Sequence, residues 1–217
     1  MKLLFNRPRL MMLAGVALGL MMAGCASGPS APLKNWFSTT KTDPFTDARI
    51  CTVETRQGLV STLALTQLLY YPYVEKRGDD VRVGMIAGGQ YKIPVGRIQL
   101  RVDNHEAWTI ETGETPVDMG TVNAQQIAAT MRSATPATPS AQQQNYEATA
   151  TAMANSINQA MSPYTVTTGE KARRIIEQMR TGRQLIFRTL GANQPASSMG
   201  NADLGPEFNA ALAQCGI

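Results

Sequence analysis

Arg97-Ile98-Gln99-Leu100-Arg101-Val102-Asp103 is the stretch that decides the fold, because it alternates apolar and polar side chains along its whole length. Successive side chains of a β-strand point to opposite faces, so Ile98, Leu100 and Val102 are predicted to share one face. An apolar face of this kind is buried against a second layer of structure. The segment therefore predicts a strand that contributes one face to a core.

Strand features recur on both sides of this segment. Alternation, or a richness in β-branched and aromatic residues, marks residues 49–57, 62–74, 81–87, 107–112 and 185–189. Short strands at near-regular spacing favour an antiparallel sandwich or barrel-like sheet. The predicted fold class is α+β and β-rich, an antiparallel β-sandwich-like domain with C-terminal helices.

Helical patterns appear in the second half of the chain. Residues 123–133 have helical spacing, and Asn123 is a suitable N-cap. A linker rich in Pro, Thr and Ala is predicted near 134–144, and a helical segment near 142–181.

The end of that helical segment carries the clearest signals. Thr167 and Glu170 have the spacing of a capping box, followed by an apolar stripe over 172–179. Gly182 is predicted to end this helix. Pro206–Gln214 predicts a short final helix.

The first residues have the parts of an export signal. Leu10–Met22 is an apolar run of 13 residues, shorter than the roughly 20 that a membrane-spanning helix needs. Basic residues precede this run, namely Lys2, Arg7 and Arg9. The pattern predicts a signal peptide over 1–24, a tether over 25–34, and a single domain over 35–217.

Met22-Ala23-Gly24-Cys25 resembles the bacterial lipobox. The resemblance implies that Cys25 carries a diacylglyceryl thioether and that cleavage before it frees an amine for acylation. Two or three acyl chains hold a protein on a membrane far more firmly than one. Ala26, in the place where Asp would retain the protein at the inner membrane, implies the outer membrane and a domain facing the periplasm. The alternative is an ordinary secretory signal with a chance cysteine.

The charge balance gives no support to nucleic-acid binding. Three of the 20 basic residues lie within 1–24, which hold no acidic residue, so 17 basic and 16 acidic residues remain. Nucleic-acid binding depends on clustered positive charge that neutralises phosphates. The predicted partners are instead the membrane, through the lipid anchor, and an envelope protein, while the oligomeric state stays open.

Cys51 and Cys215 remain once Cys25 is lipidated. An even pair in an oxidising compartment favours a disulfide over a metal site. The alternative is a pair of free thiols, one of them buried in a strand.

Residues suited to catalysis are few. His105, the one histidine, lies in a predicted turn, and the chain has no Gly-x-Ser-x-Gly elbow for a nucleophile. We therefore predict no catalytic residue, no metal site and no cofactor. A run of five acids could serve glycan hydrolysis, with Glu106, Glu111 and Glu114 the candidates, but no pair is singled out. The run comprises Asp103, Glu106, Glu111, Glu114 and Asp118.

Two groups of residues are candidate partner contacts. Aromatic side chains at a strand end suggest a protein-contact surface or, alternatively, half-buried sheet packing. These are Tyr70, Tyr71 and Tyr73. A basic stretch suggests contact with anionic envelope components or, alternatively, a salt-bridged exposed helix. It contains Lys171, Arg173, Arg174, Arg180, Arg183 and Arg188.

Arg101 is the one basic residue for which we expect burial. A charged residue in a central strand is rarely buried without a partner, and Asp103 or Glu111 could provide the carboxylate.

Two longer segments of the chain are similar to the invasion-associated locus B family of exported bacterial proteins. They are Gly89–Asp103 and Ile176–Arg188, and the second is followed by Leu204-Gly205 and Phe208–Leu212. The resemblance implies a β-sandwich completed by a helix-Gly-strand segment and a final short helix. It implies no catalytic residue.

These features predict a periplasmic lipoprotein of the outer membrane that is not an enzyme but a binding or scaffolding module of the cell envelope. The alternatives are an enzyme acting on envelope glycan through carboxylates and a carrier of a lipid or small ligand.

Overall fold

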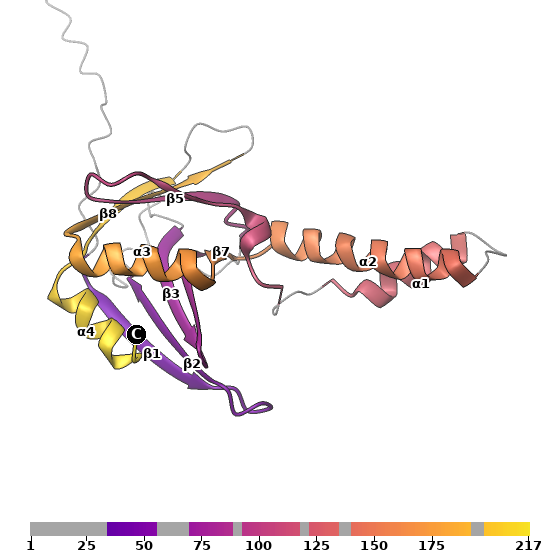
Figure 1. Ribbon diagram of the computed structural model, residues 1–217, viewed down its shortest axis with the longest axis horizontal. Helices are drawn as coiled ribbons and strands as arrows, with labels where there is room; N and C mark the ends of the chain where they lie inside the picture. Colours follow the sequence, from indigo (N-terminus) through magenta and orange to yellow (C-terminus); the bar gives the residue numbers. More distant parts are fainter. Residues whose placement is uncertain (1–33, 56–69, 89–92, 118–121, 135–139, 192–197) are drawn as a thin grey trace, which may run out of the picture.

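Two antiparallel β-sheets and four helices make up the part of the chain that the computed structural model describes (Figure 1). This part comprises residues 34–55, 70–88, 93–117, 122–134, 140–191 and 198–217. The fold is the β-rich α+β class that the strand pattern predicts, with a sandwich-like pair of sheets and helices at the C-terminal end.

The first sheet has five strands in the order β1-β2-β3-β4-β7. Each neighbouring pair is antiparallel, and β3 turns into β4 at Gly78, whose φ of 60° suits glycine. The strands are β1 Trp36–Thr42, β2 Arg49–Thr55, β3 Tyr70–Arg77, β4 Asp80–Ala87 and β7 Tyr164–Thr167.

The second sheet has four strands in the order β6-β5-β8-β9. Ile98, Leu100 and Val102 of β5 are fully buried on its inner face, as the alternation predicts. Phe187 of β8, which pairs with Leu100, is buried beside them. The strands are β5 Arg97–Val102, β6 Trp108–Ile110, β8 Gln184–Leu190 and β9 Ser198–Asp203.

Helix α3 (Gly169–Thr181) contributes an apolar stripe to the core between the sheets. Trp108 of β6 donates a hydrogen bond from its indole N–H to Gln178, at 2.8 Å. Lys171 donates to the backbone oxygen of Thr109, at 2.7 Å. The helix ends at Gly182, as predicted, and its buried side chains are Ala172, Ile175, Ile176 and Met179.

Helix α4 (Pro206–Gln214) packs on β1 and β2. Phe208 lies against the Trp36 ring with 4.6 Å between centroids, and the Trp36 indole N–H donates to the Asp203 backbone oxygen at 2.7 Å. These contacts join the first strand of one sheet to the last strand of the other. The predicted short final helix is confirmed.

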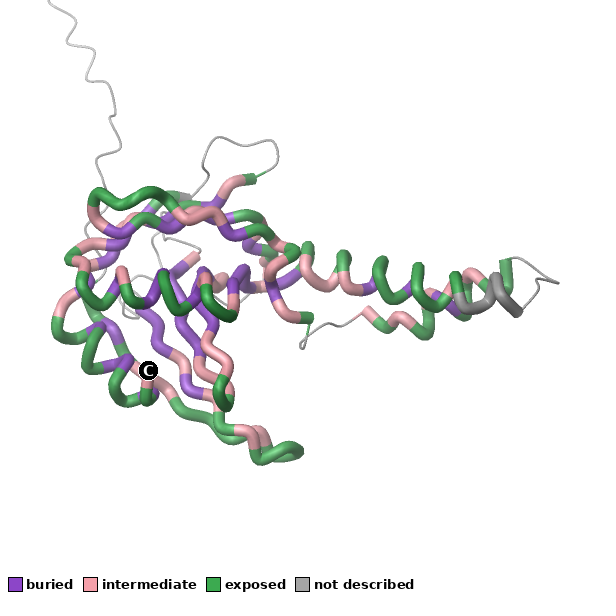
Figure 2. Tube along the Cα trace, viewed as in Figure 1, coloured by how far each residue is buried: buried purple, intermediate pink, exposed green. Residues whose placement is uncertain are grey.

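Helices α1 (Ala124–Ala134) and α2 (Ser140–Ala160) form a hairpin that projects from the sheets and is mostly exposed (Figures 1 and 2). A helix of 21 residues is about 31 Å long. Small buried residues let the two helices approach closely, and these are Ala128, Ala150 and Ala154. The expected cap of α1 is present, because the Asn123 side chain accepts a hydrogen bond from the Gln125 N–H at 2.8 Å.

The structure corrects the sequence prediction at three strands and at the start of one helix. Strands β1, β7 and β9 were not predicted, and β7 interrupts the helical segment expected over 142–181. The capping box of Thr167 and Glu170 is wrong, because Thr167 belongs to β7 and α3 begins only after Thr168.

Other predicted segments are described in part. The strand expected over 62–74 is represented by β3, which begins at Tyr70, while 56–69 lie outside the described residues. The linker expected near 134–144 includes 135–139, also outside them, and α2 already begins at Ser140. Among the described residues, no helix is both long and apolar enough to cross a membrane.

Candidate functional site

The outer face of the second sheet carries the most distinctive surface of the described chain. Its strands bury one face in the core, so alternate residues point outward. Two pairs of the β5–β8 register lie on this outer face, Gln99 opposite Arg188 and Arg101 opposite Ile186. Met199 of β9 lies opposite Arg188 and is 60% exposed.

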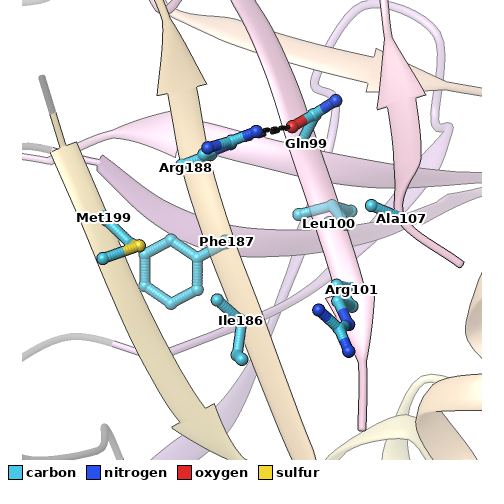
Figure 3. Close-up of a pocket in the computed structure, with 8 residues that line it drawn as sticks. All are labelled: Gln99, Leu100, Arg101, Ala107, Ile186, Phe187, Arg188 and Met199. Carbon is cyan, nitrogen blue, oxygen red and sulfur yellow. Dashed lines mark hydrogen bonds between the residues drawn. The ribbon is translucent and has the colours of Figure 1, made fainter. Parts of the chain in front are cut away.

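Arg188 is held in place by neutral partners. Its guanidinium donates two hydrogen bonds to the Gln99 side-chain oxygen, one of them at 2.8 Å (Figure 3). The Gln99 amide in turn donates to the Thr109 hydroxyl at 3.0 Å. The Arg188 charge is therefore oriented by an amide, and no carboxylate of the described residues neutralises it.

Arg101 is exposed on the same face, and the prediction that it is buried against Asp103 or Glu111 is wrong. The physical reason is the alternation itself, since Ile98, Leu100 and Val102 take the inner face and leave Arg101 the outer one. Within the described residues, the side chain of Arg101 has no hydrogen bond or ion pair.

Between these side chains lies a shallow hollow of about 320 Å³. Guanidinium groups lie beside apolar side chains in it, and Figure 3 shows Arg101 and Arg188 on neighbouring strands with Ile186 and Met199 close by. The lining residues are Gln99, Leu100, Arg101, Ala107, Ile186, Phe187, Arg188 and Met199. This surface, the guanidinium hollow, can hold an anion together with an apolar group.

The predicted tyrosine contacts are placed differently. Tyr71 and Tyr73 are buried, so within this structure they belong to the packing of the first sheet. Tyr70 is half-buried and donates a hydrogen bond to the Pro94 backbone oxygen at 3.1 Å. This arrangement matches the alternative of sheet packing.

Tyr73 also belongs to a buried polar cluster that the sequence did not reveal. Its hydroxyl donates to the Glu75 carboxylate, and Arg82 lies 3.5 Å from the same carboxylate. Burial, together with the neighbouring Glu75 charge, raises the pKa of Tyr73 far above its ordinary value of 10.0. A phenol that holds its proton so firmly is a structural hydrogen-bond donor and not a nucleophile.

The basic residues of α3 lie on its solvent side. Arg173, Arg174 and Arg180 are exposed, and Arg174 forms an i,i+4 ion pair with Glu170, which fits the alternative of a salt-bridged exposed helix. Arg188 belongs to β8 and is therefore not part of this helical surface.

The acidic run is engaged in structural contacts. Glu111 binds Arg97 at 2.7 Å, and Glu114 binds Lys171 at 2.8 Å. Asp103 accepts the backbone N–H groups that follow α3, with Gln184 at 2.9 Å. Asp118 lies outside the described residues.

The pKa of Glu114 bears on the enzyme alternative. Burial would raise this pKa, but the hydrogen bond from Lys171 and other donors outweigh it and lower the pKa below its ordinary value of 4.5. A catalytic general acid needs a shift in the opposite direction. Glu106 and His105 are exposed in the turn between β5 and β6.

The cysteine pair is joined as predicted. Cys51 of β2 and Cys215 form a disulfide with 5.5 Å between Cα atoms, within the usual range. Cys25 lies outside the described residues. Among the described residues, no group of three or more His, Cys, Asp or Glu could hold a metal ion.

Sequence reasoning missed the guanidinium hollow as a unit. The outward positions of β5 were available from its alternation, but the pairing of β5 with β8 is a long-range contact that one sequence does not reveal. Met199 lies in a strand without a strand-like pattern, so nothing in the sequence indicated it.

Comparison with known proteins adds no relative. No protein-family model matches this chain, no curated protein matches it, and no solved structure matches it. The similarities to the lipobox and to the invasion-associated locus B family therefore stay predictions from the sequence.

Proposed function

We propose that this chain is a bacterial lipoprotein, anchored through Cys25 in the outer membrane, whose periplasmic domain is a non-enzymatic binding module for an anionic envelope component. The observation that carries the binding role is the guanidinium hollow, where Arg101 and Arg188 stand exposed without a carboxylate partner among the described residues. Such groups recognise carboxylates and phosphates through paired N–H donors.

Two features support the proposed location. Leu10–Met22 followed by Cys25 has the pattern of a lipoprotein signal. The disulfide of Cys51 and Cys215 fits an oxidising compartment such as the periplasm.

The anchor is tested by Cys25→Ala in cells of a bacterium that processes lipoproteins. We expect the wild-type chain to sediment with outer membranes and the variant to lose this association, because the acyl chains provide the attachment. Ser27→Ala is the matched control, since it changes the tether beside the anchor but leaves Cys25 and the disulfide in place. A Cys25→Ala chain that still fractionates with the membrane would contradict the proposed anchor.

The binding role is tested by chemical cross-linking in intact cells, followed by purification of the lipidated chain and mass spectrometry. We expect one or two recurrent envelope components that are lost in an Arg101→Gln/Arg188→Gln variant. Recurrent protein partners that persist in this variant would favour a scaffold acting through another surface and would contradict the assigned site.

A second candidate function is a carrier of a lipid or small ligand. The observation that favours it is the apolar part of the hollow, where Ile186 and the exposed Met199 flank the cations.

A further inference from the structure

We infer that the guanidinium hollow binds an amphiphilic anion, with a phosphate or carboxylate head between Arg101 and Arg188 and an alkyl chain along Ile186 and Met199. This inference rests on the proposed function and names the ligand class of that same site.

The head-group position follows from the strand register. Arg101 pairs with Ile186, and Arg188 lies two residues further along β8 on the same face. Such diagonal neighbours are about 7–8 Å apart at their backbones. Figure 3 shows the two guanidinium groups turned apart, Arg188 toward Gln99 and Arg101 away from it along β5, so Arg101 reaches an anion bound at Arg188 by changing its rotamer. Gln99 fixes Arg188 through its side-chain oxygen, which reduces the rotamer freedom that binding would otherwise remove.

Among the described residues, the two acidic side chains nearest the strands of this face are already paired. Glu111 lies 2.7 Å from Arg97, and Asp203 lies 3.7 Å from Lys34. Neither pair includes Arg101 or Arg188. Within the part of the chain that the structure describes, the two guanidinium groups therefore keep a positive charge without a carboxylate partner, which selects an anion over a neutral ligand.

The apolar part of the hollow distinguishes an amphiphile from a simple anion. Ile186 is half-buried and Met199 is 60% exposed, and both lie on the outer face of the sheet. Methionine adapts its shape to apolar ligands. An alkyl chain that covers these side chains removes apolar surface from water on both partners.

The alkyl chain gives a graded test. We propose titrating the lipidated full-length chain, held in neutral phosphatidylcholine nanodiscs, with alkyl phosphates of four, six and eight carbons by calorimetry. Empty nanodiscs provide the blank. Each buried methylene is expected to lower the Kd about three- to fourfold. Inorganic phosphate is expected to bind more weakly than any of the three.

Matched variants separate the head from the tail. Arg101→Gln/Arg188→Gln is expected to raise the Kd of every ligand at least tenfold. Arg173→Gln/Arg180→Gln removes the same charge from α3 and is expected to leave each Kd unchanged. Met199→Ser is expected to make the Kd depend less on the length of the alkyl chain, and to leave the Kd of inorganic phosphate unchanged. Thermal unfolding checks that each variant is folded, and Arg101→Lys/Arg188→Lys, which keeps the charge, is expected to retain part of the affinity.

Two results would overturn the inference. One is a Kd that does not change with chain length, which would describe a site for anions alone. The other is equal weakening by the hollow and the α3 variants, which would describe general charge attraction. Either result leaves the anchoring test at Cys25 untouched, so the two proposals can fail separately.

The source of the amphiphile is decided in the same system. Nanodiscs that contain phosphatidylglycerol are expected to compete with octyl phosphate if the ligand is a lipid of the membrane. If these nanodiscs do not compete and the soluble alkyl phosphates still bind, the ligand is a free amphiphile and not a lipid of the membrane. Both results support an amphiphilic anion, and they differ in where it comes from.

Discussion

Gly84 of β4 lies where β7 leaves no room for a side chain. A Cβ atom added there would lie 1.9 Å from the Thr165 backbone oxygen, closer than any real contact. The φ of this residue is not the reason, because the obstruction is the backbone of β7. The absence of a side chain at this one position therefore lets β7 join the sheet.

Gly84→Ala is expected to destabilise the fold by about 1–3 kcal/mol, because the clash requires β4 and β7 to separate. The free energy of unfolding measured with urea checks this value. Gly113→Ala is the matched control, since its added Cβ meets nothing within 4 Å. Equal stability of the two variants would contradict the packing described for Gly84.

Tyr73 makes the stability depend on alkaline pH. Its folded pKa is raised above 10.0, so above about pH 10 the unfolded chain releases a phenolic proton that the folded chain still holds. The stability is therefore complete below pH 10 and falls as the pH rises beyond it. Unfolding between pH 8 and 11 is expected to show this fall, and Tyr73→Phe is expected to make it shallower. An equal slope for Tyr73→Phe and the wild-type chain would contradict the role assigned to the buried Tyr73 hydroxyl.

At the scale of elements, the sequence identified the strands that have one fully buried face. Strand β5 alternates cleanly because its inner residues are entirely in the core. Strands β1 and β9 lie at the sheet edges, and β1 buries only Trp36 of its seven residues. An edge strand with one buried residue has no alternation to detect. Strand β9 does alternate in burial, but its buried residues are Gly200 and Ala202, which are too small to give an apolar pattern in the sequence. Strand β7 was read as part of a helical segment because it has only four residues, all of them buried, and so shows no alternation.

The candidate site was predictable only in part. The outward direction of Gln99 follows from the strand period, but Arg188 was assigned to a basic stretch that also included α3. The helix and the strand lie on different surfaces, and only the sheet order shows that Arg188 adjoins β5. Residues far apart in sequence form this site, and their proximity depends on tertiary structure.

The α1–α2 hairpin depends on alanine. Ala154→Leu is expected to force α1 and α2 apart, because Ala154 is buried and the packed helices leave no room for a larger side chain. Limited proteolysis is expected to cut the hairpin of this variant while the sheets stay intact. Ala152→Leu, on the exposed side of α2, is the control. A hairpin that resists proteolysis equally in both variants would contradict the close approach.

At the scale of the whole molecule, the disulfide spans most of the domain. Cys51 and Cys215 are 164 residues apart in sequence, and α4 brings them together on β2. Constraining a loop of this length in the unfolded chain stabilises the fold by up to about 5 kcal/mol.

Reduction, or Cys51→Ala/Cys215→Ala, is expected to lower the free energy of unfolding by about 2–5 kcal/mol. Chemical denaturation with and without reductant measures this difference, and the double variant should be insensitive to reductant. A loss below about 1 kcal/mol would contradict a large contribution of the bond.

The same disulfide has a consequence for the order of events during biosynthesis. A polypeptide emerges from its N-terminal side, so Cys51 appears long before its partner and carries a free thiol while 164 further residues follow. The covalent closure can occur only after α4 has emerged and reached β2. A chain that is interrupted before that point keeps a reactive thiol. Any quality-control system that detects thiols can therefore distinguish it from a completed chain.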